Sequence, residues 1–238
     1  MWIFFNLMNL IRKISGIRGI VDKSFNVKVV FNHALAFSKL KAKGPILVAR
    51  DTRSHGKQFS EIACKAISSS GIDVYDYGII PTPTAQFLIS KNNFSGGIVI
   101  TASHNPIEWN GMKFMNSDGC FLNEKQNIKL FSKADNVTKV TKIQSGNIFY
   151  IKNGFEEHVK HTVNLPFINK KEIKLKTFKI VVDAVNGAAS YAIPYLLRLL
   201  CCKVIPLFCK PDGNFPHDPE PKNENLDLLS KSVIKNKA

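Results

Sequence analysis

Short apolar segments alternate with amphipathic segments along most of this chain, and this alternation restricts the fold more than any other feature. Apolar runs typical of buried strands occur at 46–49, 72–78 and 96–101. Segments with a helical period of apolar residues occur at 57–70, 82–91 and 123–133. Strands that alternate with helices predict an α/β sandwich, with helices on both faces of a mixed sheet.

A second α/β unit follows a polar stretch at 134–153. Its expected elements are a connecting helix, a strand with its turn, a helix that Pro194 interrupts, and a second strand, at 155–165, 178–187, 188–200 and 202–208. A last helical pattern at 226–236 has no strand after it. The sequence therefore predicts two domains, 1–153 and 154–238, the second of them incomplete.

The charge of the chain limits the partners that it can have. Its 238 residues include 28 Lys and 5 Arg, and the formal net charge is +15. Compositional drift toward lysine explains this charge, and so does an anionic substrate or a nucleic acid. The lysines are spread along the chain without an arginine-rich or aromatic-interleaved block, which argues against nucleic acid.

Arginine is scarce, so its positions are informative. Arg18, Arg50 and Arg53 lie in two short polar loops, SGIRG and ARDTR. The planar guanidinium binds phosphate or carboxylate through paired donors that lysine lacks. Surface ion pairs are the alternative, and we favour recognition of an anion or a carboxylate.

The five cysteines have no zinc-site spacing and favour reduced thiols in a cytoplasmic protein. No run approaches the roughly 20 apolar residues of a membrane helix, so we expect no membrane partner. The apolar start, MWIFFNLMNLI, lacks the basic region of a signal peptide. Translation from Met8 rather than Met1 is one interpretation, and packing of residues 1–7 in a strand or core is the other.

The stretch ITASHNPIEWNGMKF, residues 100–114, places a serine, a histidine and a lysine after a buried strand. Ser103 and His104 are neighbours whose side chains diverge, and no Gly-x-Ser-x-Gly elbow is present, so serine-hydrolase chemistry is disfavoured. The alternative is a serine that accepts a phosphoryl group, which needs cations around it. We expect Lys113 to return to this loop through a turn at Asn110-Gly111; a solvated strand lysine is the alternative.

These residues resemble the phosphoserine loop of the α-D-phosphohexomutases, the family of phosphoglucomutase, phosphomannomutase and phosphoglucosamine mutase. Further segments resemble the family in the same order, at 15–20, 49–56, 78–84, 181–189 and 212–226. The resemblance covers residues 9–238, and its details are most similar to a phosphoglucosamine mutase or phosphomannomutase branch. It implies phosphohexomutase-type α/β/α sandwich domains and an isomerase that moves a phosphoryl group within a hexose or hexosamine phosphate.

The resemblance also implies roles for individual residues. Ser103 is the expected phosphoryl carrier, and its phosphate is the expected ligand of Mg²⁺. Lys113 is expected to assist proton transfer, and Arg18 to stabilise the transferring group. The residues expected to order the loop or to bind near the phosphate are His104, Asn105, Asn110 and Arg53. With Arg50 and Asp51, Arg53 is expected to join the loops rather than to touch substrate.

The family's Asp-x-Asp-x-Asp metal loop is absent from this sequence, and so are the segments that recognise the sugar and its distal phosphate. His217, Asp218 and Glu220 resemble metal ligands, but the family pattern makes their loop structural. We therefore expect the second domain to stop before the metal-binding loop, and the polypeptide alone to have little or no mutase activity.

Three interpretations remain open at this point. The first is the N-terminal part of a phosphohexomutase, with a second polypeptide as a possible source of the missing domains. The second is a non-catalytic module that binds a sugar phosphate, and measurable affinity without turnover would identify it. The third is a basic nucleic-acid-binding protein, which the order of the motifs argues against.

Overall fold

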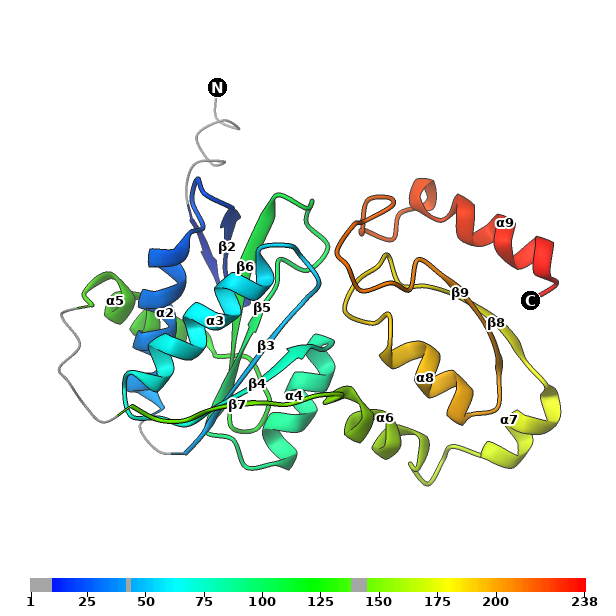
Figure 1. The fold of residues 1–238 in the computed structure, drawn as a ribbon, viewed down its shortest axis with the longest axis horizontal. Coiled ribbons are helices and arrows are strands. Elements are labelled where there is room, and N and C mark those ends of the chain that lie inside the picture. The colour runs from blue at the N-terminus through cyan, green and yellow to red at the C-terminus, as the bar shows by residue number, and fades with distance from the viewer. Residues whose placement is uncertain (1–9, 42–43, 138–144) are drawn as a thin grey trace.

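The computed structural model describes residues 10–41, 44–137 and 145–238 (Figure 1). These residues form an N-terminal lobe (10–150) and a C-terminal lobe (155–238), joined by a short connection after β7. The proposed extension at residues 1–7 and the choice between Met1 and Met8 lie outside the described residues. The domain boundary at 153/154 stays a prediction.

The N-terminal lobe is built on a mixed sheet with the strand order β1-β2-β6-β5-β3-β4-β7. The strands are β1 Ile11–Lys13, β2 Gly16–Ile20, β3 Ile46–Arg50, β4 Val74–Ile79, β5 Gly96–Ile100, β6 Trp109–Asn116 and β7 Ile148–Tyr150. Strands β5, β3, β4 and β7 are parallel, whereas β1, β2 and β6 add antiparallel pairs at the other end. The predicted mixed sheet is confirmed.

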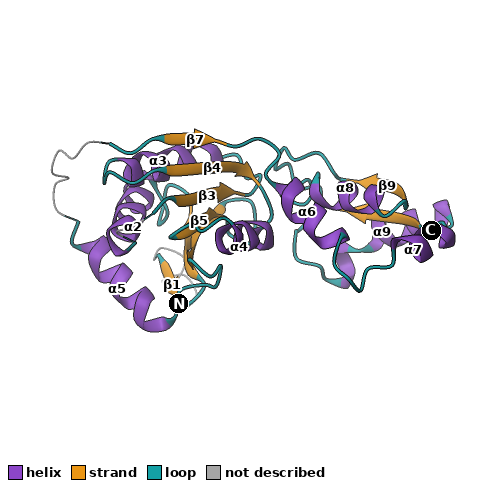
Figure 2. Ribbon diagram, turned by 90° about the horizontal axis from the view of Figure 1, so that it is seen from below, coloured by secondary structure: helices purple, strands orange, loops and turns teal. Residues whose placement is uncertain are grey.

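Helices cover both faces of this sheet (Figure 2). One face packs against three helices, α2 Val27–Leu40, α3 Gly56–Ser68 and α5 Glu124–Asp135. The other face packs against α4 Thr82–Lys91. The predicted α/β/α arrangement is confirmed, and α4 has the predicted bounds because its second residue, Pro83, suits the first turn of a helix.

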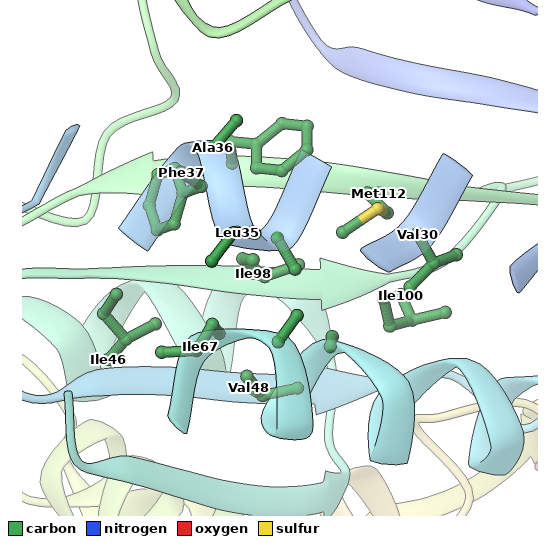
Figure 3. Close-up of a cluster of buried hydrophobic side chains, with 14 of the residues drawn as sticks. Val30, Leu35, Ala36, Phe37, Ile46, Val48, Ile67, Ile98, Ile100 and Met112 are labelled. Atoms are coloured by element: carbon green, nitrogen blue, oxygen red, sulfur yellow. The ribbon is translucent and has the colours of Figure 1, made fainter. Parts of the chain in front are cut away.

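The central strands are apolar on both faces because both faces are covered. In β3, Val48 points to one core cluster and Leu47 to the other. Figure 3 shows the first cluster, in which Val30 of α2 lies near Ile100 of β5. These residues have almost no exposed surface, so β3 and β5 form a rigid support for the loops that follow them.

The prediction of a turn at Asn110-Gly111 is wrong. Both residues lie inside β6, where Asn110 pairs with Gly19 and Gly111 with Arg18 of β2. A Cβ atom on Gly111 would lie 2.3 Å from the carbonyl oxygen of Ile17, so the glycine is needed for close approach of two strands rather than for a turn. Lys113 therefore reaches the serine loop along an extended strand.

The C-terminal lobe contains two parallel strands, β8 Lys179–Asp183 and β9 Lys203–Leu207. Its helices are α6 Phe155–Val163, α7 Lys170–Lys176, α8 Ala192–Leu199, the 3-10 helix η1 Asn223–Asn225, and α9 Asp227–Asn236. The predicted helix at 188–200 begins only at Ala192, which places Pro194 in its first turn, where a missing N–H is tolerated. None of the described helices combines the length and the apolar character that crossing a bilayer requires.

Candidate functional site

Ser103 lies at the edge of the sheet where the carboxyl ends of β3, β4 and β5 come together. We call residues 101–109 the serine loop. Its backbone turns away from β5 at Ser103, whose φ of 59° lies in the left-handed region that non-glycine residues seldom adopt. The side chain of Ser103 is exposed, while Thr101 and Ala102 before it are buried. The loop therefore exposes the serine hydroxyl to solvent, while the two residues before it are held in the protein interior.

A chain of hydrogen bonds joins the serine loop to the loop after β3. The Thr101 hydroxyl donates to Oδ2 of Asp51 at 2.7 Å and accepts from the backbone N–H of Ser103 at 3.0 Å. Asp51 also accepts from the backbone N–H of Arg53 at 3.0 Å and from its Nε at 3.2 Å. Asp51 thus links the two loops through ionic and neutral donors.

Arg53 lies beneath the serine loop with a side chain that is almost completely buried. Its Nη2 donates to the carbonyls of Ser103 at 3.1 Å and Asn105 at 2.6 Å, and its Nη1 donates to the carbonyl of Pro106 at 2.6 Å. Burial lowers the pKa of Arg53, and the charge of Asp51 opposes this shift. One guanidinium therefore fixes three carbonyls of the loop, a geometry that its planar fork of donors allows.

A cavity of about 230 Å³ opens beside Ser103. The structure brings four of the predicted site residues to its wall: Arg18 from β2, Lys113 from β6, and Ser103 and His104 from the serine loop. Lys13 of β1 adds a third cation. Among the described residues that line this cavity, none is acidic, so its electrostatic potential favours an anion.

Lys113 is half-buried in β6 and lies opposite Val99 of β5. Its Nζ lies 5.4 Å from the centre of the Phe121 ring. Burial lowers the pKa of Lys113, and the positive charge of Arg18 lowers it further. A lysine whose ammonium form is disfavoured in this way has a larger fraction of the amine form, which can accept a proton.

The remaining predicted residues lie away from the cavity wall. Asn105 lies within the serine loop, where its side-chain amide donates to the carbonyl of Ala102 at 2.5 Å. Asn110 is fully buried in β6, and its Oδ1 accepts from the backbone N–H of Gly111 at 2.8 Å. Asn110 therefore contacts its own strand rather than the cavity.

Sequence reasoning missed Thr101 and Lys13. Thr101 is the first residue after β5, so a hydroxyl at the carboxyl end of a parallel strand was a usable signal. Lys13 was one of many lysines, and only the pairing of β1 with β2, in which Lys13 lies opposite Gly16, brings it to the cavity that Arg18 also lines. No local pattern distinguished it from the others.

A second cavity of about 240 Å³ lies between the lobes, on another side of Ser103. Asp51, Thr52 and Ser103 line it from the N-terminal lobe, and Val185 and Phe215 line it from the C-terminal lobe. The Thr52 hydroxyl is buried and has no hydrogen-bond partner among the described residues. The C-terminal lobe thus contributes a wall to the surroundings of Ser103.

The loop that contains His217, Asp218 and Glu220, which resemble metal ligands, is bonded to the sheet of the C-terminal lobe. Nε2 of His217 lies 3.0 Å from Oδ2 of Asp183, at the end of β8, and Nδ1 lies 2.8 Å from the carbonyl of Asp218. Burial lowers the pKa of His217, but these two contacts outweigh it and the pKa is raised. Residues 10–41, 44–137 and 145–238 contain no group of three or more His, Cys, Asp and Glu that fits a metal ion.

Comparison with known proteins gives matches along almost the whole chain. Two family models match: "Phosphoglucomutase/phosphomannomutase, alpha/beta/alpha domain I" over residues 9–141 and "Phosphoglucomutase/phosphomannomutase, alpha/beta/alpha domain II" over residues 155–238. A phosphoglucomutase/phosphomannomutase of Thermococcus kodakarensis is 37% identical over 89% of this chain and 47% of its own length. A phosphoglucosamine mutase of Caldicellulosiruptor saccharolyticus is 34% identical over 94% of this chain and 50% of its own length.

A solved structure supports the same comparison. A phosphoglucomutase/phosphomannomutase family protein of Burkholderia thailandensis superimposes with a TM-score of 0.76 at 27% identity. It covers 94% of this chain and 50% of its own. The chain spans about half the length of the relatives that it matches.

Proposed function

This chain belongs to the phosphoglucomutase/phosphomannomutase family, and we propose that it takes part in phosphohexomutase chemistry as the half that contains the phosphoserine. The observation that supports this most directly is the exposed Ser103 hydroxyl beside a cavity lined by Arg18, Lys113 and Lys13. A doubly charged phosphoryl group on Ser103 would be surrounded by cations, as phosphoryl transfer requires.

The proposed step transfers a phosphoryl group between Ser103 and a sugar hydroxyl. The hydroxyl oxygen attacks phosphorus, and the bond from Oγ of Ser103 to phosphorus breaks. The proton of the sugar hydroxyl passes to the amine form of Lys113, and the departing Oγ of Ser103 takes up a proton from the solvent to which it is exposed. Arg18 neutralises charge on the transferring group, and Arg53 keeps the loop in position. Reversal of the step, with a second phosphate of the sugar, returns the group to the serine. The substrate class is hexose or hexosamine phosphates.

Mg²⁺ is the cofactor that the resemblance implies, with the Ser103 phosphate as its ligand. The described residues provide no cluster of carboxylates around Ser103 to complete its coordination. The described residues therefore do not fit the ion by themselves.

The test is whether Ser103 accepts a phosphoryl group. The purified chain is incubated with a hexose 1,6-bisphosphate, and its intact mass and phosphopeptides are measured. We expect one added phosphoryl group located on Ser103, and none in Ser103→Ala. Ser117→Ala removes another exposed serine and should be labelled like the wild type. A wild-type chain that gains no phosphoryl group, or gains one elsewhere, contradicts the proposal.

The second candidate is a module that binds a sugar phosphate without transferring the phosphoryl group. The cationic cavity favours it equally, because binding an anion needs only the charges. Calorimetric titration with glucose 1-phosphate separates the two: binding without label on Ser103 indicates the module.

Complete turnover is expected to need the segments that the longer relatives have. A second polypeptide or a continuation of this chain would supply them, and adding such a polypeptide should produce mutase activity.

A cytoplasmic location is proposed from the five cysteines, which are free thiols.

A further inference from the structure

A contact between the two lobes lies next to the serine loop. The guanidinium carbon of Arg53 lies 5.1 Å from the centre of the Phe215 ring, which belongs to the C-terminal lobe. This is the same guanidinium that donates to three carbonyls of the serine loop. An aromatic ring at this distance from a cation is attracted to it.

The backbone next to Phe215 approaches the N-terminal lobe too closely for most residues. Gly213 has a φ of 73°, and a Cβ atom on it would lie 2.1 Å from the carbonyl oxygen of Thr52, the residue before Arg53. Only glycine suits both this backbone conformation and this contact. The segment 213–215 therefore lies against the main chain of the Arg53 loop.

Asn186 fixes the loop that contains Phe215. Its Oδ1 accepts from the backbone N–H of Lys210 at 3.0 Å, and its Nδ2 donates to the carbonyl of Asn214 at 2.9 Å. Asn186 itself has a left-handed backbone, with φ of 50°, next to Val185, which has the same φ. A β-branched residue in this region is strained, which occurs mainly where the surrounding structure enforces it. The ring of Phe215 is thus held in place from within its own lobe.

We propose that Phe215 is a positioning residue for the serine loop: the C-terminal lobe places its ring on Arg53, and Arg53 in turn holds Ser103. The two lobes would then not be independent, because the geometry around Ser103 would depend on the loop at 211–219. This inference deepens the proposed function and rests on it for the importance of Ser103. The contact itself can be tested without any sugar phosphate.

The experiment is peptide-level hydrogen exchange on the full 238-residue chain. Three amides of the serine loop report on its geometry, since they donate to partners inside the loop: Ser103, Asn105 and Trp109. In Phe215→Leu, which keeps apolar volume but loses the ring, we expect peptides over 101–109 to exchange about tenfold faster. Peptides over β5 should not change, because that strand is held by its neighbours on both sides.

Two variants serve as controls. Phe215→Tyr keeps the ring and should exchange like the wild type. Phe178→Leu makes the same change at a half-exposed phenylalanine of the same lobe and should leave the serine loop unchanged. Unchanged exchange at 101–109 in Phe215→Leu would overturn the proposal.

If Phe215→Leu does not fold, Gly213→Ala tests the same contact from the backbone, because the added methyl group displaces the loop from Thr52. The same acceleration at 101–109 is expected, and its absence again overturns the proposal. A chain that shows these exchange changes but never accepts a phosphoryl group would contradict the proposed function and support the positioning contact. The two failures are therefore distinguishable.

Discussion

The Nη2 atom of Arg53 donates a hydrogen bond to the main-chain carbonyl of Ser103 at 3.1 Å, although the two residues follow different strands. This contact links a strained backbone to a buried cation. A left-handed conformation costs about 1–3 kcal/mol for a non-glycine residue. The hydrogen bonds from Arg53 to the carbonyls of Ser103, Asn105 and Pro106 offset that cost. A buried side chain therefore holds the backbone of an exposed serine in its strained conformation.

Arg53→Lys is expected to destabilise the chain by about 2–3 kcal/mol, because an ammonium group cannot satisfy three carbonyls and Asp51 at once. Arg50→Lys is the matched control in the same loop. Arg50 donates to one carbonyl, that of Asp51, and should lose less than about 1 kcal/mol. Urea unfolding of both variants measures the difference. Equal losses would mean that the fork of Arg53 does not stabilise the serine loop.

Thr101 and Thr52 are buried threonines near the same site with opposite expectations. The Thr101 hydroxyl has two partners, Asp51 and the amide of Ser103, so Thr101→Val should cost about 1–3 kcal/mol. The Thr52 hydroxyl has no partner among the described residues, so Thr52→Val should change the free energy of unfolding by less than about 0.5 kcal/mol or increase it. Denaturant unfolding of the two variants provides the comparison. A loss at Thr52 as large as that at Thr101 would indicate a partner for its hydroxyl.

The pKa of Lys113 should depend on Arg18. Burial is the main cause of its lowered pKa, and the Arg18 charge is the second. Arg18→Gln removes a positive neighbour, which favours the ammonium form, so the pKa of Lys113 should rise toward its ordinary value without reaching it. The proposed transfer from phosphorylated Ser103 should then require a higher pH than in the wild type.

NMR titration of the Lys113 side chain measures this pKa directly. Arg12→Gln is the control, since Arg12 forms an ion pair with Asp135 and is absent from the cavity wall. It should leave the titration of Lys113 unchanged. An identical midpoint in Arg18→Gln and the wild type would show that the two cations do not interact.

Much of the sheet and its helices follow from local sequence, but the site does so only in part. The apolar runs at β3 and β5 and the proline at the start of α4 act locally, and their elements were predicted close to their observed bounds. The turn at Asn110-Gly111 was predicted wrongly because an Asn-Gly pair looks the same in the sequence in both cases: when its glycine forms a turn and when it lets two strands approach closely. The contact between Arg53 and Phe215 joins two lobes, and no periodicity of either segment contains that information.

The imidazole of His33 is buried between α2 and the sheet. It lies near the rings of Phe114 and Phe131, at centroid distances of 6.5 and 6.1 Å. Its Nδ1 lies 2.7 Å from the carbonyl oxygen of Val29. This contact raises the pKa of His33, but burial lowers it by more. Burial lowers the pKa of His33 from 6.5 to about 4. The folded chain therefore contains neutral His33 at pH 5, while the unfolded chain binds a proton there.

Protons that bind only the unfolded state destabilise the fold as the pH falls. The stability associated with neutral His33 is present at pH 7, decreases below pH 6.5, and stops decreasing below about pH 4. Between pH 7 and pH 5 the wild type should lose about 2 kcal/mol more than His33→Phe, which cannot titrate. Urea unfolding at both pH values measures these losses. Equal losses in the wild type and His33→Phe would show that His33 binds protons equally well in the folded and the unfolded chain.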